Sequence, residues 1–217
     1  MREVFAGDLP LDLAIRFSNC AACLTMTNLA RPYRVSGMLI NDMDDFWVFG
    51  YGSLMWRPGF EFEEAKRGRL FGYRRALCIY SYVRRGTPEK PGLVLGLDQG
   101  GSCTGMVYRV SGGNREAVMS YLRARELVTN VYLERTSPVH LSDGRRITAV
   151  CYVADTSHHQ FAGHLSADDA ARRVMVSEGK SGHNVDYVAS TVAHLKEMEI
   201  RDHWLEDVAR RMDALTR

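Results

Sequence analysis

The chain has 217 residues, of which 46% are hydrophobic and 25% are charged, and its formal net charge is +2. These values are typical of a soluble globular protein with one sizeable core, and the scattered basic pairs, mixed with acidic residues, argue against nucleic-acid binding. No apolar segment approaches the roughly 18 residues of a membrane helix, and the N-terminus lacks the long apolar core of a secretory signal, so we expect no membrane insertion.

The first part of the chain differs in pattern from the remainder. We interpret residues 1–44 as an N-terminal extension, in which a short helix begins near Leu11. Residues 45–217 are expected to form one domain, because strand-like and helical patterns succeed each other there without a linker or a repeat.

The chain contains five cysteines, an odd number. Cys20 and Cys23 form a Cys-x-x-Cys pair, but a redox or metal role needs a thioredoxin-like setting or a second ligand pair, and neither is visible. Cys78, Cys103 and Cys151 lie in apolar, strand-like segments and are interpreted as buried thiols. This usage of cysteine favours a reduced, cytoplasmic protein.

The first strand-like run, Phe46 to Phe49, stops abruptly at Gly50-Tyr51-Gly52-Ser53. Two glycines two positions apart let the backbone turn sharply and present bare N–H groups to an anion or a carboxylate. The same glycines also fit an ordinary tight turn, and the local sequence does not separate the two interpretations.

Strands come first and helices come later. Further strand-like segments are Leu70–Val83, Leu93–Leu97, Thr104–Val110, Val131–Leu141 and Ile147–Ala154. One helix is expected to interrupt them, capped by Asn114 and ending near Glu126. Three helices are expected to close the chain, capped by Ser166, Asn184 and Asp202, the first of them ending at Gly179. This order favours an α+β fold over a doubly wound sheet.

Glu126 is placed against local rules. At about 100° per residue it lies between Met119 and Leu122 on the apolar face of its helix, in the last turn, where the helix dipole disfavours negative charge. Desolvation and the dipole raise the pKa of such a carboxyl, whereas a neighbouring arginine lowers it. Two interpretations stay open: a general base, or a structural ion pair at the rim of the core.

Other reactive residue types show no recognisable spacing. His158, His159 and His164 cluster in a loop-like region without a metal-binding motif, so no metal site is expected. Ser53 lies in Gly-Ser-Leu, which is not a nucleophile elbow, and the chain has no phosphate-binding glycine motif.

Five motifs occur in order along the chain. They are Trp47–Trp56, Arg85-Gly86-Thr87 with Lys90-Pro91-Gly92, Thr104–Arg109, Arg125-Glu126 with Tyr132, and Ser181–Tyr187. In combination they resemble the bacterial branch of the ChaC family, the glutathione-specific γ-glutamylcyclotransferases. They cover the chain from Trp47 to Tyr187, and residues 1–44 lie outside the resemblance. One departure is the segment Leu127–Val131, where the family often has a small or glycine-containing turn.

The resemblance implies a γ-glutamylcyclotransferase-like fold, a small mixed β-barrel flanked by helices with a pocket at its mouth. It also implies cleavage of glutathione to 5-oxoproline and cysteinylglycine without a cofactor. Glu126 takes the role of catalytic carboxylate. The substrate-binding positions are Tyr51, Gly52, Ser53, Leu54, Arg85, Tyr132 and Tyr187.

Some of these roles have competing interpretations. Arg85 or Lys90 meets the glycine carboxylate of glutathione, or both belong to a solvated basic loop. Tyr187 hydrogen-bonds substrate or Glu126, or is a packed aromatic at a helix start. The alternatives for the whole chain are a cyclotransferase for other γ-glutamyl amino acids or amines, and a non-catalytic γ-glutamyl-binding regulator of cation transport. The sequence leaves the oligomeric state open.

Overall fold

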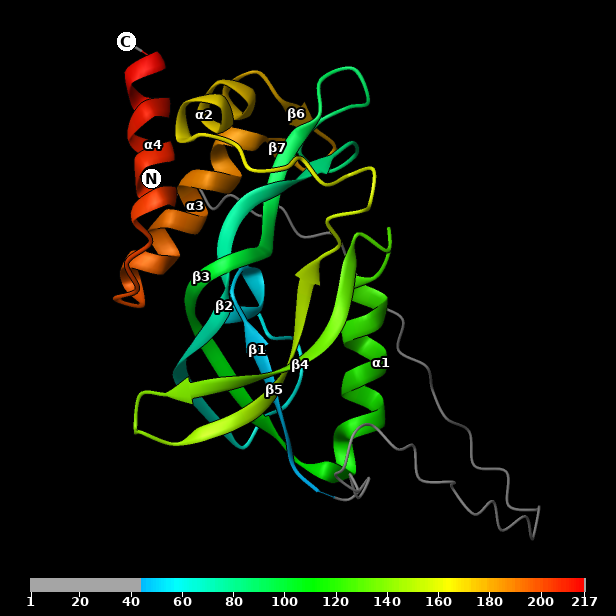
Figure 1. Ribbon diagram of the computed structural model, residues 1–217. Helices are drawn as coiled ribbons and strands as arrows, with labels where there is room; N and C mark the ends of the chain where they lie inside the picture. The colour runs from blue at the N-terminus through cyan, green and yellow to red at the C-terminus, as the bar shows by residue number, and fades with distance from the viewer. Residues whose placement is uncertain (1–43, 217) are drawn as a thin grey trace, which may run out of the picture. The chain divides into compact units, whose positions relative to one another are not determined.

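The computed structural model describes residues 44–216. Most of the expected N-terminal extension, including Cys20 and Cys23, therefore lies outside the described residues. The described chain forms a closed barrel whose strands have the order β1, β3, β2, β4, β5 (Figure 1). Their bounds are β1 Phe46–Gly50, β2 Glu64–Ser81, β3 Gly92–Val110, β4 Tyr132–Leu141 and β5 Arg146–Ala154.

The barrel is mixed, as expected for an α+β fold of this kind. All neighbouring strands pair antiparallel except β1 and β5, which close the barrel as a parallel pair through Trp47 opposite Ala149 and Val48 opposite Val150. Because β1 and β5 run parallel and β4 runs against β5, the ends of β1 and β5 lie beside the beginning of β4. This end of the barrel carries the candidate site.

Two strands are longer than the sequence pattern predicts. β2 begins at Glu64 rather than Leu70, because its first residues alternate between partly buried and exposed positions despite their charge. The two strands expected over 93–97 and 104–110 are one strand, β3. Gly100 and Gly101, with φ of +91° and +72°, lie at an irregularity of the β2–β3 pairing instead of ending the strand.

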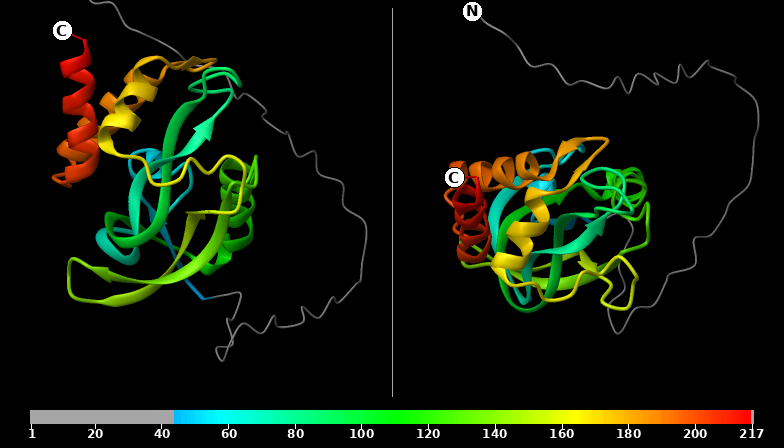
Figure 2. Two further views of the ribbon diagram at one scale, coloured as in Figure 1. Left: turned by 45° about the horizontal axis from the view of Figure 1, so that its top comes forward. Right: turned by 90° about the horizontal axis from the view of Figure 1, so that it is seen from above.

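Helices cover the barrel on two sides. Helix α1 lies on one side, and α2, α3 and α4 form a group on another (Figures 1 and 2). A two-stranded hairpin of β6 and β7 connects α2 to α3. The bounds are α1 Arg115–Glu126, α2 Ala167–Met175, β6 Glu178–Gly179, β7 Gly182–His183, α3 Asn184–Glu197 and α4 His203–Leu215, with short 3₁₀ turns η1 Ser53–Met55 and η2 Gly112–Asn114. None of the helices in residues 44–216 is long and apolar enough to cross a membrane.

Two of the predicted helix caps are confirmed. The Ser166 hydroxyl accepts a hydrogen bond from the Asp169 N–H at 3.1 Å, and Asp202 accepts one from the Leu205 N–H at 3.1 Å. Such contacts satisfy N–H groups that the first helical turn leaves without partners. Asn114 occupies the cap position of α1, but its side chain makes no capping hydrogen bond.

Asn184 is not a cap, and this prediction was wrong. His183 occupies the cap position, while Asn184 is fully buried and bonds both backbone groups of Leu93 in β3. Leu93 N–H donates to Asn184 Oδ1 at 2.6 Å, and Asn184 Nδ2 donates to the Leu93 carbonyl at 2.9 Å. Asn184 therefore ties the start of α3 to the barrel. Helix α2 also ends earlier than predicted, at Met175, because the residues up to Gly179 turn into the β6–β7 hairpin.

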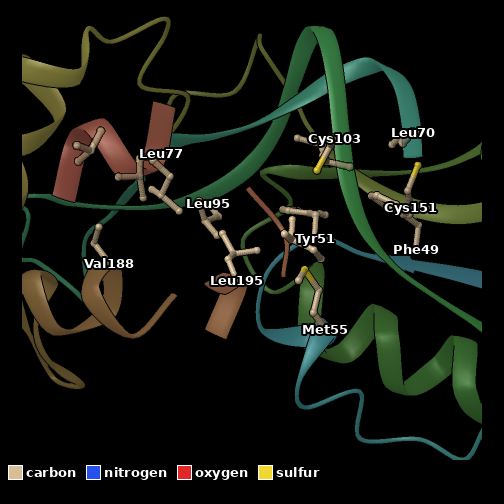
Figure 3. Packing of buried hydrophobic residues seen from close by; sticks show 14 of the residues in the cluster. Phe49, Tyr51, Met55, Leu70, Leu77, Leu95, Cys103, Cys151, Val188 and Leu195 are labelled. Atoms are coloured by element: carbon tan, nitrogen blue, oxygen red, sulfur yellow. The ribbon is translucent and has the colours of Figure 1, made fainter. Parts of the chain in front are cut away.

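Strand β5 explains how the core is divided. Cys151 and Val153 point into the barrel interior, where Figure 3 shows Cys151 with Phe49, Leu70 and Cys103. The alternate residues of β5, Val150 and Tyr152, pack against α1 through its buried side chains Val118 and Leu122. Cys78, Cys103 and Cys151 are free, buried thiols, as predicted.

The packing of α1 directs Glu126 toward the end of the barrel. Leu122 is completely buried, so its truncation to alanine is expected to cost about 2–5 kcal/mol of the free energy of unfolding. Glu126 comes four residues after Leu122 and shares its face of the helix. The apolar stripe that fixes α1 therefore carries a carboxylate to the place where β4 begins.

Candidate active site

A pocket opens at the end of the barrel where β1 and β5 finish. It brings together the loop after β1, the start of β3, the end of α1, the start of β4, the end of β5 and the first turn of α3. Its lining residues are Tyr51, Gly52, Ser53, Leu54, Val94, Leu95, Glu126, Tyr132, Tyr152 and Tyr187. Glu126 and all the expected substrate-binding residues except Arg85 thus meet in one place.

A larger cavity lies between α3 and α4, but three of its four charged lining residues are already paired. Arg201 and Glu206 form two hydrogen bonds of 2.7 Å, and Asp202 pairs with Arg75 at 2.8 Å. The smaller pocket at the barrel end instead holds a mostly buried carboxyl group and tyrosine hydroxyls. Its chemistry therefore makes the barrel-end pocket the better candidate.

The loop after β1 forms a row of backbone donors, which we call the cradle, residues Tyr51–Leu54. Its carbonyl groups take part in the turn η1, where the Met55 N–H bonds the Gly52 carbonyl at 2.8 Å. Within residues 44–216, the N–H groups of Gly52, Ser53 and Leu54 have no hydrogen-bond acceptor. Successive N–H groups of this kind form a concavity suited to anionic oxygen.

Gly52 leaves this row open to the pocket. A methyl group added at Gly52 would meet only Leu95 Cδ1, at an ordinary contact distance of 3.6 Å. At Gly50, by contrast, an added methyl would lie 3.0 Å from Leu54 Cβ, which is tighter than normal packing. A side chain at position 50 would therefore force Leu54 to shift, whereas one at position 52 would project toward the pocket residue Leu95 without a close contact.

Arg75 fixes the cradle from behind and was missed in the sequence. Its side chain is only 2% exposed, and it donates to the Tyr51 carbonyl at 2.6 Å, to the Thr104 carbonyl at 2.7 Å and to Asp202 at 2.8 Å. The sequence contains one signal for this position. Arg75 lies two residues before Leu77 in a strand, so the two side chains share the face that turns inward. The Arg74-Arg75 doublet obscured that signal because basic pairs are usually solvated.

Glu126 is both mostly buried and in contact with an arginine. Its side chain is 18% exposed, and desolvation raises the pKa of its carboxyl group, while Arg125 acts to lower that pKa. Arg125 Nε lies 3.2 Å from Glu126 Oε1. The other nitrogens of this guanidinium are occupied elsewhere, by Ser53 Oγ at 2.8 Å, the carbonyls of Arg57 at 2.8 Å and Pro58 at 3.3 Å, and Tyr121 Oη at 2.9 Å.

Two tyrosines in the pocket bond the same backbone residue. Tyr132 Oη donates to the Leu95 carbonyl at 2.7 Å, and Tyr187 Oη accepts from the Leu95 N–H at 3.2 Å. Burial raises the pKa of Tyr187 to about 12 and that of Tyr132 well above its usual range, so both hydroxyls stay protonated at neutral pH. Tyr187 is therefore both a packed aromatic and a hydrogen-bonding group.

Tyr152 lines the pocket although no sequence pattern singles it out. It lies within the apolar run of β5, where an aromatic residue is expected to belong to the hydrophobic core. Its hydroxyl donates to Glu134 Oε2 at 3.1 Å, and Glu134 is held in turn by Arg123. The ring faces the pocket while the hydroxyl group is engaged behind it.

Arg85 does not line the pocket. Its guanidinium donates to the carbonyls of Ser181 at 2.6 Å and His183 at 3.2 Å, and its central carbon lies 5.4 Å from the centroid of the Tyr187 ring. Arg85 thus supports the β6–β7 hairpin and stacks on a pocket tyrosine. Lys90 belongs to the exposed loop between β2 and β3.

The histidine cluster is not arranged as a metal site. The rings of His158 and His159 lie against each other in a tilted arrangement with centroids 4.3 Å apart, and His164 contacts the buried Asp98 at 2.8 Å. Across residues 44–216, no three His, Cys, Asp or Glu side chains are grouped to hold an ion. Nor do these histidines line the pocket.

Known proteins resemble this chain in sequence and in fold. The family model for ChaC-like proteins matches residues 46–214. Glutathione-specific gamma-glutamylcyclotransferase of Escherichia coli strain K12 is 34% identical over 188 residues, covering 87% of this chain and 78% of that protein. Glutathione-specific gamma-glutamylcyclotransferase 1 of Homo sapiens is 31% identical over 151 residues, or 68% of either protein.

A solved structure extends the similarity to the fold. The crystal structure of a yeast gamma-glutamyl cyclotransferase specific to glutathione matches with a TM-score of 0.71 at 24% identity, covering 79% of this chain and 96% of that one. The γ-glutamylcyclotransferase-like barrel flanked by helices is thereby confirmed as the fold. With the family match spanning nearly all described residues, the chain belongs to the ChaC-like protein family.

Proposed function

We propose that this chain is a glutathione-specific γ-glutamylcyclotransferase, which cleaves glutathione to 5-oxoproline and cysteinylglycine. The observation that carries the proposal is the meeting of a mostly buried carboxyl group, Glu126, with a row of free N–H groups over Gly52–Leu54 in one pocket. The names of the relatives in Escherichia coli and Homo sapiens support the same activity.

The reaction joins two atoms of a single substrate. The α-amino nitrogen of the γ-glutamyl group attacks the γ-amide carbon, a five-membered ring forms, and the bond to the cysteine nitrogen breaks. Because nucleophile and electrophile belong to one molecule, bending the substrate into a reactive conformation supplies much of the rate acceleration. We therefore expect no metal or organic cofactor, and activity should survive dialysis against EDTA.

Glu126 supplies the proton transfer that this ring closure needs. The α-amino group is protonated at neutral pH, so it must lose a proton before it can attack. Glu126 accepts this proton and returns it to the departing cysteine nitrogen, so the carboxyl group ends in its starting state. The second proton that the attacking nitrogen loses on becoming the ring amide passes to the released amine, which leaves as an ammonium group. A pKa raised by desolvation suits both steps, because the carboxylate is then a stronger base toward the α-amino group and can still release the proton to the departing nitrogen.

The cradle supplies the positive electrostatic environment. The N–H groups of Gly52, Ser53 and Leu54 are directed at an anionic oxygen of the γ-glutamyl group, either its α-carboxylate or the oxyanion that develops on the γ-carbonyl. Arg75 holds the Tyr51 carbonyl at the start of this row and keeps the donors in place before substrate arrives. Preorganised donors stabilise developing charge without having to reorient during the reaction.

We also propose that the reaction takes place in the cytoplasm. All three cysteines of the described chain, Cys78, Cys103 and Cys151, are free and buried. Free thiols are usual where the compartment is reducing, which is also where a thiol-containing substrate stays reduced. Detection of the protein in the soluble cytoplasmic fraction of its cell would support this placement, and its recovery from a secreted or periplasmic fraction would contradict it.

The decisive experiment is incubation of the full-length protein with reduced glutathione, followed by mass detection of 5-oxoproline and cysteinylglycine. The proposal expects equal amounts of both products, and none from the Glu126→Gln variant under the same conditions. The same assay with γ-glutamyl-alanine tests the wider class of γ-glutamyl substrates. Faster release of 5-oxoproline from that dipeptide would contradict glutathione specificity, and binding without any product would contradict catalysis.

A further inference from the structure

The hydroxyl groups of Tyr132 and Tyr187 lie on the same backbone residue but have opposite hydrogen-bonding roles. A carbonyl oxygen can only accept, so the Tyr132 hydroxyl must donate its one proton to the Leu95 carbonyl. A backbone N–H can only donate, so the Tyr187 oxygen must accept from Leu95. These roles result from the partners alone and need no observed hydrogen positions.

Each hydroxyl therefore offers the pocket a single polarity. Tyr132 has no proton left and presents only oxygen lone pairs, so it accepts hydrogen bonds. Tyr187 keeps its proton, which has no acceptor among the hydrogen bonds of residues 44–216, so it donates. Because both phenols remain protonated at neutral pH, this polarity does not change in the physiological range.

The spacing of the two hydroxyls is set by their shared partner. In an extended strand, the N–H and C=O of one residue point to the same side of the chain. Leu95 therefore holds an acceptor, Tyr132 Oη, beside a donor, the Tyr187 hydroxyl, within the same pocket. An α-amino acid head group carries an ammonium donor beside a carboxylate acceptor on one carbon atom, which is the complementary pattern.

Neighbouring groups strengthen both halves of this pattern. On the accepting side, the Glu126 carboxyl group lines the same pocket. On the donating side, Ser53 Oγ accepts from Arg125 at 2.8 Å, which leaves the serine proton free. The pocket thus holds, besides the two tyrosines, a further group that accepts hydrogen bonds and a further group that donates them.

We propose that Tyr132 and Tyr187 together select the free α-amino acid head of the γ-glutamyl group, Tyr132 accepting from its amino group and Tyr187 donating to its α-carboxylate. This inference rests on the proposed function, because it assigns the head group of the same substrate. It makes the two tyrosines specificity-determining residues that reject acyl groups lacking either charge. It also leaves the cradle N–H groups for the oxygen of the γ-carbonyl.

The test measures binding by calorimetry to the full-length Glu126→Gln chain, so that no ligand is turned over. Three ligands are compared: glutathione, glutaryl-cysteinylglycine, which lacks the α-amino group, and 4-aminobutyryl-cysteinylglycine, which lacks the α-carboxylate. Each is measured with the two tyrosines intact, with Tyr132→Phe and with Tyr187→Phe. Thermal unfolding of every variant checks that it is folded.

The proposal expects a crossed pattern. Tyr132→Phe weakens glutathione and 4-aminobutyryl-cysteinylglycine by roughly tenfold but leaves the glutaryl ligand unchanged, because hydrogen bonds to charged groups are the stronger class. Tyr187→Phe weakens glutathione and the glutaryl ligand by a similar factor and leaves the 4-aminobutyryl ligand unchanged. Equal weakening of all three ligands by either variant would mean a purely structural role and would overturn the proposal.

Tyr108→Phe is the matched control. The Tyr108 hydroxyl also donates to a backbone carbonyl, that of Met55 at 2.6 Å, but Tyr108 does not line the pocket. Its removal should change the three affinities by one common factor, and a selective loss of one ligand would contradict the assignment. If a tyrosine variant does not fold, comparing the three ligands on the chain that keeps both tyrosines still tests the proposal. Glutaryl-cysteinylglycine binding as tightly as glutathione overturns the inference, whereas no binding of glutathione at all overturns the proposed function as well.

Discussion

Helix α1 brings an arginine to each of two glutamates beside the pocket, with opposite results. Arg123 donates two hydrogen bonds to Glu134, at 2.9 and 2.8 Å, and these chiefly account for the lowered pKa of that carboxyl group. Arg125 approaches Glu126 with one nitrogen at 3.2 Å, and desolvation outweighs it, so the pKa of Glu126 is raised.

The difference arises from what else each arginine binds. Arg123 has Glu134 as its main partner and meets it with a two-pronged contact, the strong geometry for a carboxylate. Arg125 divides its donors between the cradle and the loop after it, so only a weak contact remains for Glu126. A carboxylate fixed in its charge serves structure, whereas one held loosely in a desolvated place can exchange a proton.

The largest effect is expected from Glu126→Gln. The amide keeps the shape of the side chain but cannot accept a proton, so kcat for 5-oxoproline release should fall at least about 100-fold, as general acid–base magnitudes indicate. Quenched-time-point mass detection measures the rate, and calorimetry with glutathione checks that the pocket still binds. Release at the parental rate would show that another group is the base.

The same variant, which should lose activity, is not expected to lose stability. Because the pKa of Glu126 is raised in the folded protein, this carboxyl favours folding most when it is protonated, and that contribution is lost as the pH rises through the raised pKa. Glu126→Gln should therefore be at least as stable as the parent at neutral pH, with the difference shrinking in acid. Thermal unfolding at several pH values measures it, and a clear loss of stability at neutral pH would contradict the reasoning.

How far the sequence predicts this site depends on whether the signal is local. Helix periodicity places Glu126 on the apolar face, and the structure gives it the raised pKa that this position implies. The Gly50-Tyr51-Gly52 pattern predicts a sharp turn at a strand end, which is where η1 forms. Both signals depend on residues close together in the chain. The roles of Tyr132 and Tyr187 came only from the family resemblance, because their contacts with Leu95 join segments far apart.

The contacts that sequence reasoning missed are long-range ones. Arg75 belongs to a basic pair in the sequence, and such pairs are usually solvated. Its side chain nevertheless bonds the cradle and the residue that caps α4. Asn184 has the residue type of a helix cap, yet its side chain bonds the buried backbone of Leu93 instead of the first turn of α3. The sequence pattern ends one strand at Leu97, although pairing with β2 continues on both sides of Gly100 and Gly101. Tertiary partners decided each case.

An intermediate effect is expected from Arg125→Gln, which removes the arginine of the Arg125–Glu126 contact and leaves the glutamate in place. Glu126 must be deprotonated to act as a base, so kcat/KM falls as the pH drops through its pKa. Arg125 lowers that pKa, so its removal raises the pKa and moves the acidic limb of the kcat/KM profile to higher pH. At neutral pH the loss should be at least about tenfold, since a hydrogen bond to a charged group contributes roughly 1.5–3 kcal/mol.

Arg125→Lys separates the charge from the geometry of the guanidinium. Lysine keeps the positive charge but not the fork that reaches Ser53 and the carbonyl of Arg57. In Arg125→Lys, the acidic limb of the kcat/KM profile should therefore lie close to that of the parent. KM should be raised, because the contact between Ser53 of the cradle and α1 is lost. An acidic limb that is identical in all three proteins would show that Arg125 has no influence on the base.

The smallest effect is expected from Glu134→Gln, the counterpart of the first variant. Because the pKa of Glu134 is lowered by folding, its ion pair stabilises the protein above the unfolded pKa, and this contribution is lost as the pH falls through the folded one. Arg123 is largely exposed, so the variant should lose no more than about 1 kcal/mol of unfolding free energy at neutral pH.

Activity gives the sharper outcome for this variant. Glu134 holds the hydroxyl of Tyr152 behind the pocket wall and has no proton to exchange near neutral pH, so kcat should stay within roughly threefold of the parent, the protein remaining folded. Denaturant unfolding and the 5-oxoproline assay, run on one preparation, measure both quantities. A loss of kcat comparable to that of Glu126→Gln would mean that the two carboxylates act as a coupled pair, and the contrast between a structural and a proton-transferring glutamate would fail.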